Sequence, residues 1–110
     1  MKLADLAEEL SLKVLTYNEG TDRDVSGCYI SDMLSDVMAN SKKGDIWITI
    51  QAHTNILAVA NLKNLSGIIV VNGREVDEET LKRADSEKVT ILSSSLSAFE
   101  IAGKIYKMIM

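Results

Sequence analysis

The sequence predicts an α/β domain of three layers, in which helices flank a mostly parallel sheet of about five short strands. One unit occurs three times in a row: a short apolar strand, a turn of small polar residues and a helix. The strands are predicted at 46–50, 68–71 and 89–92, and the helices that follow them at 55–65, 77–88 and 98–110. A strand, a crossover helix and the next strand form a βαβ unit, so these strands are expected to lie parallel.

The first 45 residues complete this architecture with shorter elements. Leucine and alanine recur at helical spacing over 2–10, which predicts an amphipathic helix. Strands are predicted at 13–16 and 25–30, the second interrupted by Gly27. Ser31 or Asp32 is expected to cap a helix that begins near Met33 and ends before Lys42. Whether the strand at 13–16 runs antiparallel at an edge is left open.

Length and composition indicate one globular domain over residues 1–110. The net charge of −4 and the scattered basic residues argue against a nucleic-acid partner. Cys28, the single cysteine, excludes an internal disulfide, suits a reducing cytoplasm and is interpreted as a small buried residue. The first ten residues resemble neither a signal peptide nor a membrane span, so we expect a cytoplasmic protein that does not bind membranes.

Two predicted helices carry more apolar residues than one buried face requires. The helix at 77–88 has only Leu81 and Ala84 to bury, whereas 55–65 and 98–110 are apolar nearly all round. We interpret the excess as a homodimer interface; the alternative is that neighbouring elements of the same copy cover both helices. The candidate interface residues are Ile56, Leu57, Val59, Ala60, Ile101, Ile105 and Met108.

The turns after the three repeated strands are the expected ligand site, because ligands of parallel sheets bind at the carboxyl ends of strands. His53 could bind a ligand or transfer a proton, Arg74 could bind a carboxylate or phosphate, and the serines could hold an anion. The alternatives are a surface histidine, a solvated arginine and ordinary helix capping. The candidate ligand-binding residues are Gln51, His53, Thr54, Asn72, Gly73, Arg74, Ser93, Ser94 and Ser95.

The sequence contains no recognisable catalytic set. Phosphate-loop, dinucleotide, CxxC and nucleophile-elbow motifs are absent from the sequence. The acidic pairs Asp22/Asp24 and Asp32/Asp36 are interpreted as solvated charge, so we expect no metal and no cofactor. A small enzyme that uses His53 with Gln51 or Ser94 remains an alternative, although no partner base or nucleophile is specified.

Four segments resemble the DRTGG domain family. They are Asp-Arg-Asp-Val-Ser-Gly at 22–27, the glycine-led strands at 44–49 and 67–73, and the helix start at 96–102. The similarity runs from about residue 12 to the end of the chain. The chain is similar to stand-alone DRTGG proteins, and it resembles only the N-terminal, non-catalytic region of HPr kinase/phosphorylase.

This resemblance implies a regulatory or assembly module, commonly dimeric, that is not itself an enzyme. The hypothesis is therefore a homodimeric regulatory module that senses a small anionic metabolite or nucleotide at the strand ends, binds a protein partner, or does both. A subunit that only mediates protein–protein contacts is the alternative.

Overall fold

A computed structural model describes residues 1–109 and confirms the predicted α/β fold class. The five-stranded sheet has the order β1-β5-β4-β3-β2, from β1 (Lys13–Val14) at one edge to β2 (Gly27–Ile30) at the other. Between them lie β5 (Ile91–Ser93), β4 (Gly67–Val70) and β3 (Asp45–Thr49). The helices are α1 (Leu3–Glu9), α2 (Leu34–Asn40), α3 (Asn55–Lys63), α4 (Glu78–Ser86) and α5 (Ala98–Ile109), with a 3-10 turn η1 (Asn18–Asp22). Met110, the last residue of the predicted helix 98–110, lies outside the described residues.

Four of the five strands run parallel, and the edge strand β1 runs antiparallel to β5. The sequence had left open whether the strand at 13–16 runs antiparallel at an edge, and the structure shows that it does. Beyond Val14, the buried Thr16 hydroxyl extends the pairing, because it donates to the carbonyl of Val89 at 2.7 Å and accepts from the amide of Ile91 at 2.9 Å. Since β1 is antiparallel, its first residue lies beside the last residue of β5, where Lys13 pairs with Ser93.

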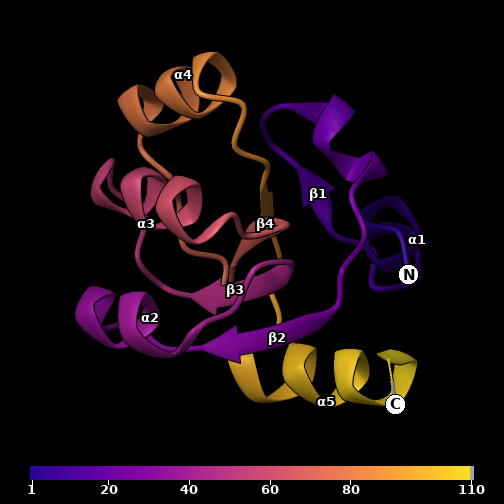
Figure 1. The fold of residues 1–110 in the computed structure, drawn as a ribbon. Helices are drawn as coiled ribbons and strands as arrows, with labels where there is room; N and C mark the ends of the chain where they lie inside the picture. The colour runs from indigo at the N-terminus through magenta and orange to yellow at the C-terminus, as the bar shows by residue number, and fades with distance from the viewer. Residues whose placement is uncertain (110) are drawn as a thin grey trace.

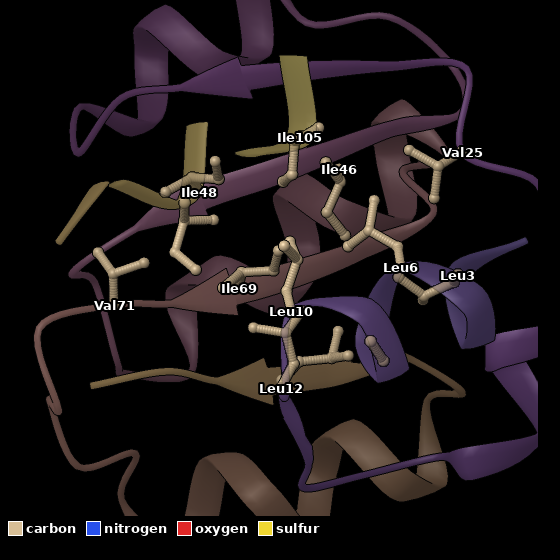
Figure 2. Packing of buried hydrophobic residues seen from close by; sticks show 13 residues of the cluster. Leu3, Leu6, Leu10, Leu12, Val25, Ile46, Ile48, Ile69, Val71 and Ile105 are labelled. Atoms are coloured by element: carbon tan, nitrogen blue, oxygen red, sulfur yellow. The ribbon is translucent and has the colours of Figure 1, made fainter. Parts of the chain in front are cut away.

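Helices cover both faces of the sheet, as Figure 1 shows: α2, α3 and α4 on one side, α1 and α5 on the other. Successive strand residues therefore enter different cores, because side chains alternate across a strand. Ile46 and Ile48 face α1 and α5, whereas Trp47 between them faces α2 and α3. Figure 2 shows the first core, in which Leu3 and Leu6 of α1 and Ile105 of α5 converge on these strands.

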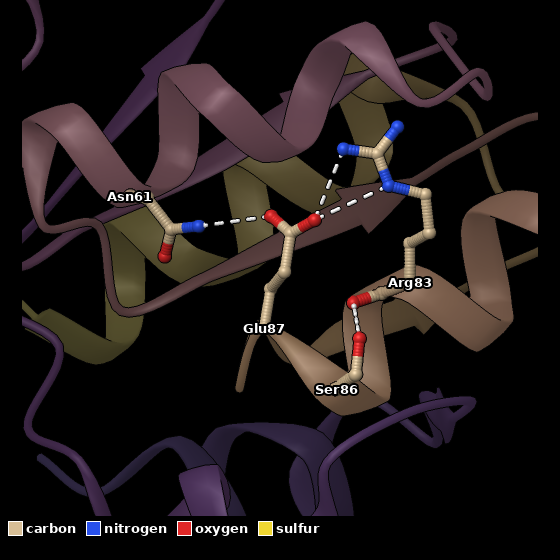
Figure 3. A network of polar contacts seen from close by, with 4 residues as sticks. All are labelled: Asn61, Arg83, Ser86 and Glu87. Carbon is tan, nitrogen blue, oxygen red and sulfur yellow. Dashed lines mark hydrogen bonds and ion pairs between the residues drawn. The ribbon is translucent and has the colours of Figure 1, made fainter.

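The helix α3 owes its uniformly apolar composition to cover within one copy. It lies between α2 and α4 on the sheet (Figure 1). Figure 3 shows the polar contacts at its edge: Asn61 donates to Glu87 at 3.3 Å, and Glu87 also pairs with Arg83 at 3.0 Å. Elements of the same copy thus cover the apolar surface of α3 that was predicted to pack against a second copy.

The predicted interface is wrong at six of the seven side chains named for it. Six of them are buried in the cores of a single copy, so they offer no surface to a partner; these are Ile56, Leu57, Val59, Ala60, Ile101 and Ile105. Met108 is half-buried against the core that contains α5. The large apolar side chains that are exposed on α3 and α5 are Leu62, Phe99 and Tyr106, at 73%, 87% and 63% exposure.

Candidate functional site

The carboxyl ends of β2, β3, β4 and β5 share one edge of the sheet, because these strands are parallel and in register. The sequence-predicted ligand residues do lie along this edge: Ser93 ends β5, and the others follow β3, β4 and β5. They form three separate groups: Gln51 beside Asp32, His53 beside Asp77, and the turn 72–74 beside the serines 93–95. The edge thus holds several local clusters.

Gln51 and Asp32 connect the end of β3 to the loop that follows β2. The Asp32 carboxylate accepts from the Thr49 hydroxyl at 2.8 Å and from the Ile50 amide at 2.9 Å. The Gln51 side chain donates to the Asp32 carbonyl at 2.8 Å. The prediction that Ser31 or Asp32 caps α2 is therefore wrong, because the capping position is Met33, which makes no side-chain cap bond. Gln51 has a structural partner, so its role in ligand binding stays a prediction.

His53 is paired with a carboxylate that has its own structural role. Its Nδ1 lies 2.8 Å from Asp77 Oδ2, and the other carboxylate oxygen of Asp77 accepts from the amide of Thr80 at 2.9 Å and from its hydroxyl. Asp77 caps α4, whose acidic start was predicted. Hydrogen bonds from His53 and then from Thr80 favour the charged form and lower the pKa of Asp77 to about 2.

The remaining candidates on the β3 side contribute little to a common site. Thr54 occupies the position before α3, but its side chain makes no cap hydrogen bond. No nucleophile hydrogen-bonds to the His53 ring within residues 1–109, and Gln51 and Ser94 have other partners. The hydrogen-bonded group required by the enzyme alternative is thus not assembled among the residues described.

The turn after β4 and the turn after β5 are bonded directly to each other. The amide of Asn72 donates to the Leu96 carbonyl at 2.8 Å, and the amide of Gly73 donates to the Ser94 carbonyl at 2.9 Å. Asn72 and Gly73 both have positive φ, at 62° and 64°, a conformation that asparagine and glycine tolerate. A Cβ at Gly73 would meet nothing within 4 Å, so this turn borders open space.

Serines 93–95 are not used to cap the following helix. That role belongs to Ser97, whose hydroxyl accepts from the Glu100 amide at 3.2 Å while the Glu100 carboxylate accepts from the Ser97 amide at 3.2 Å. The Ser94 hydroxyl accepts from the Leu96 amide at 3.0 Å. The hydroxyls of Ser93 and Ser95 make no hydrogen bond to another described residue.

These two turns form one wall of an open cavity of about 640 Å³, named here the β4–β5 cavity. The cationic side chains in its lining are Lys13 and Arg74, and Glu75 carries the one carboxylate. Neither cation takes part in an ion pair within the part of the chain that the structure describes. The remaining polar lining consists of Gly73, Ser11, Ser93, Ser94 and Ser95.

Five of these eight residues were predicted from the sequence and three were missed. One of the three is Glu75, which follows Arg74 in the chain; the other two are Lys13 and Ser11. Both precede the repeated βαβ units, and they reach the cavity only because β1 is antiparallel to β5. The predicted candidates Gln51, His53, Thr54 and Asn72 do not line this cavity. The antiparallel direction of β1, which the sequence leaves open, is what puts Lys13 opposite Ser93.

Among residues 1–109, no three His, Cys, Asp or Glu side chains are gathered where they could hold a metal ion. Nor does any described helix have the length and hydrophobicity needed to cross a bilayer.

The fold and the cavity define a small α/β module with a polar site at its strand ends. The chain belongs to the DRTGG domain family: the profile of the DRTGG domain matches residues 5–108. No curated protein sequence matches the chain.

A solved structure shares the fold. It is the crystal structure of the CBS and DRTGG domains of the regulatory region of Clostridium perfringens pyrophosphatase, complexed with the activator diadenosine tetraphosphate. The TM-score is 0.71 and the identity 18%; the match covers 93% of this chain and 44% of that one. This chain thus spans less than half of that regulatory region.

Proposed function

We propose that this chain is a non-catalytic regulatory module that recognises a small anionic metabolite, such as a nucleotide or a sugar phosphate, in the β4–β5 cavity. The observation that carries the proposal is the pair of cations, Lys13 and Arg74, which share one cavity without an ion-pair partner among the described residues. The similarity to a regulatory region that was crystallised with a nucleotide activator supports the regulatory part.

The chemistry of the cavity lining suits a phosphorylated ligand. A guanidinium binds phosphate or carboxylate through two parallel hydrogen bonds, and an ammonium adds a compact charge. Ser93 and Ser95 offer hydroxyl donors on the same wall. Glu75 repels an anion but accepts hydrogen bonds, so we infer a ligand with hydroxyl or amino groups beside its charged group.

A catalytic role has weaker support. Asp77 could orient the His53 ring for acid–base chemistry, because the two side chains are hydrogen-bonded. However, Asp77 also caps α4, and neither residue lines the β4–β5 cavity. General acid–base catalysis needs the base within hydrogen-bond reach of a reacting group. We therefore interpret His53–Asp77 as a structural contact at the start of α4.

Thermal unfolding with added ligands tests the binding proposal. The probes are ATP, AMP, pyrophosphate and glucose 6-phosphate. A ligand present at about a hundred times its Kd should add about 2.7 kcal/mol to the free energy of unfolding. Lys13→Ala and Arg74→Ala should abolish this stabilisation.

Lys43→Ala is the matched control, because Lys43 is an exposed lysine in the turn before β3, at the opposite end of that strand. The control should respond to ligand like the unmodified chain. Stabilisation that survives both cavity substitutions, or that none of the four probes produces, contradicts the proposal.

We further propose that the module is a homodimer that pairs through the outer face of α5. Phe99, Gly103 and Tyr106 share this face at helical spacing, and Gly103 leaves room for close approach. In an antiparallel α5–α5 contact about a two-fold axis near Gly103, Glu100 lies beside the partner's Lys107, and Phe99 beside the partner's Tyr106. The face is thus self-complementary in charge and in apolar surface, as a two-fold interface requires.

A further inference from the structure

A second cavity, of about 340 Å³, adjoins the β4–β5 cavity. Ser11, Ser94 and Ser95 line both, so the two hollows meet along these three residues. The second cavity adds Lys104 of α5 and Glu9 of α1 to the charged lining. Lys104 makes no ion pair with any other residue of the described range.

The lining of the joined cavities carries more positive than negative charge. Lys13 and Arg74 lie in the first cavity and Lys104 in the second, against one carboxylate in each. The lining thus has a positive excess in a chain whose net charge is −4. Cations at two places, separated by serines, suit a ligand that carries negative charge at two places.

Ser11 marks the junction of the two cavities. Its φ of 53° lies in the left-handed region, where the residue that ends a helix is usually glycine. The amide of the next residue, Leu12, donates to the Ala7 carbonyl at 2.8 Å and closes α1. The turn would therefore accept glycine, yet this residue is a serine, and it lines both cavities.

We propose that the joined cavities bind one elongated metabolite with two separate phosphate groups joined by a hydroxyl-bearing spacer, the chemistry of a sugar bisphosphate. One phosphate lies between Lys13 and Arg74, the other lies at Lys104, and the spacer crosses Ser11 and Ser95. The inference rests on the proposed function, because it assumes that the β4–β5 cavity binds an anion. It adds the second cavity to the binding site and requires a ligand that carries two phosphate groups.

Isothermal titration calorimetry with two matched sugars tests the inference. The probes are fructose 1,6-bisphosphate and fructose 6-phosphate, which differ by one phosphate. The bisphosphate should bind at least about tenfold more tightly, a factor that corresponds to about 1.4 kcal/mol. Lys104→Ala should remove this difference and leave the affinity for fructose 6-phosphate unchanged, whereas Arg74→Ala should weaken both sugars.

The outcomes separate this inference from the proposed function. If Lys104→Ala leaves the bisphosphate affinity unchanged while Arg74→Ala lowers both, one anion site exists and the bivalent ligand is refuted. If neither sugar binds the unmodified chain, the bivalent ligand is refuted, and the proposed function fails with it only when ATP, AMP, pyrophosphate and glucose 6-phosphate also give no stabilisation. If the two sugars bind equally well, the second phosphate has no partner and only the further inference falls.

Ser11→Gly provides a second test, in which a loss of affinity cannot be attributed to a folding defect. Glycine adopts the left-handed conformation without strain, so the thermal midpoint should hold or rise. The affinity for the bisphosphate should nevertheless fall, because the spacer loses the hydroxyl at the junction. An unchanged bisphosphate affinity would show that the ligand does not cross Ser11.

Discussion

Asp77 shows how one side chain can serve two neighbouring elements at the strand ends. One carboxylate oxygen receives His53 from the loop before α3, and the other receives Thr80 in the first turn of α4. The carboxylate also lies at the positive end of the α4 dipole. Each of these contacts stabilises the charged form, which is why the pKa of Asp77 falls to about 2 from an ordinary value of 3.8.

This lowered pKa predicts how the contribution of Asp77 to stability depends on pH. Because the folded pKa lies below the unfolded one, the contribution is complete above about pH 4 and is lost as the pH falls through about 2. Asp77→Asn keeps an oxygen that can cap α4 but removes the charge. It should therefore unfold at lower urea than the unmodified chain at neutral pH, and the difference should close toward pH 2.

Two further variants identify the cause. His53→Ala removes the largest contribution to the pKa shift, so it should move the acid transition to higher pH. Glu79→Gln changes another carboxyl group in the first turn of α4 and should show no comparable closing of the difference. A urea midpoint for Asp77→Asn that differs from the unmodified chain equally at neutral pH and at pH 2 contradicts the assignment.

At the scale of elements, β1 is the shortest strand of the sheet, with two residues, and Thr16 extends its pairing. The Thr16 hydroxyl is buried and bonds both the Val89 carbonyl and the Ile91 amide. Thr16→Val preserves the side-chain shape but leaves both backbone groups unpaired, which should lower the free energy of unfolding by about 1–3 kcal/mol. Chemical denaturation measures this loss.

Thr21→Val is the matched control, because the Thr21 hydroxyl donates to Asn18 at an exposed site where water can replace it. Its loss should stay within about 0.5 kcal/mol, as at most surface positions. Equal losses for the two variants would show that β1 needs no buried hydroxyl to stay paired. The point matters for the site, because β1 places Lys13 in the β4–β5 cavity.

The elements themselves could be predicted from the sequence because their signals are local. The apolar runs that became β3, β4 and β5 are continuous, as expected for strands covered on both faces, and the intervening helices follow. The direction of β1 could not be predicted, since two paired residues carry no periodicity. The lining of the cavity could be predicted only in part. Arg74 and the serines 93–95 lie at the ends of repeated strands, whereas Ser11 and Lys13 are brought to the cavity by the tertiary structure.

At the scale of the whole molecule, the apolar residues divide into those that one copy buries and those that it leaves exposed. The sequence could not make this division for α3, because a helix that is apolar all round suits either a second copy or cover by α2, the sheet and α4. The structure leaves Phe99 and Tyr106 on one face of α5, with Glu100 and Lys107 beside them. That pattern locates the proposed two-fold contact on α5.

Phe99→Glu should therefore convert the proposed dimer into a monomer, because two glutamates would face each other's apolar surface across the α5–α5 contact. Sedimentation velocity at micromolar concentration should show a shift to the monomer mass without loss of the thermal midpoint, since Phe99 is 87% exposed. Leu62→Glu places the same charge at a 73% exposed leucine on α3 and should leave the dimer intact. An unmodified chain that sediments as a monomer, or a dimer that only Leu62→Glu dissociates, would exclude α5 as the interface.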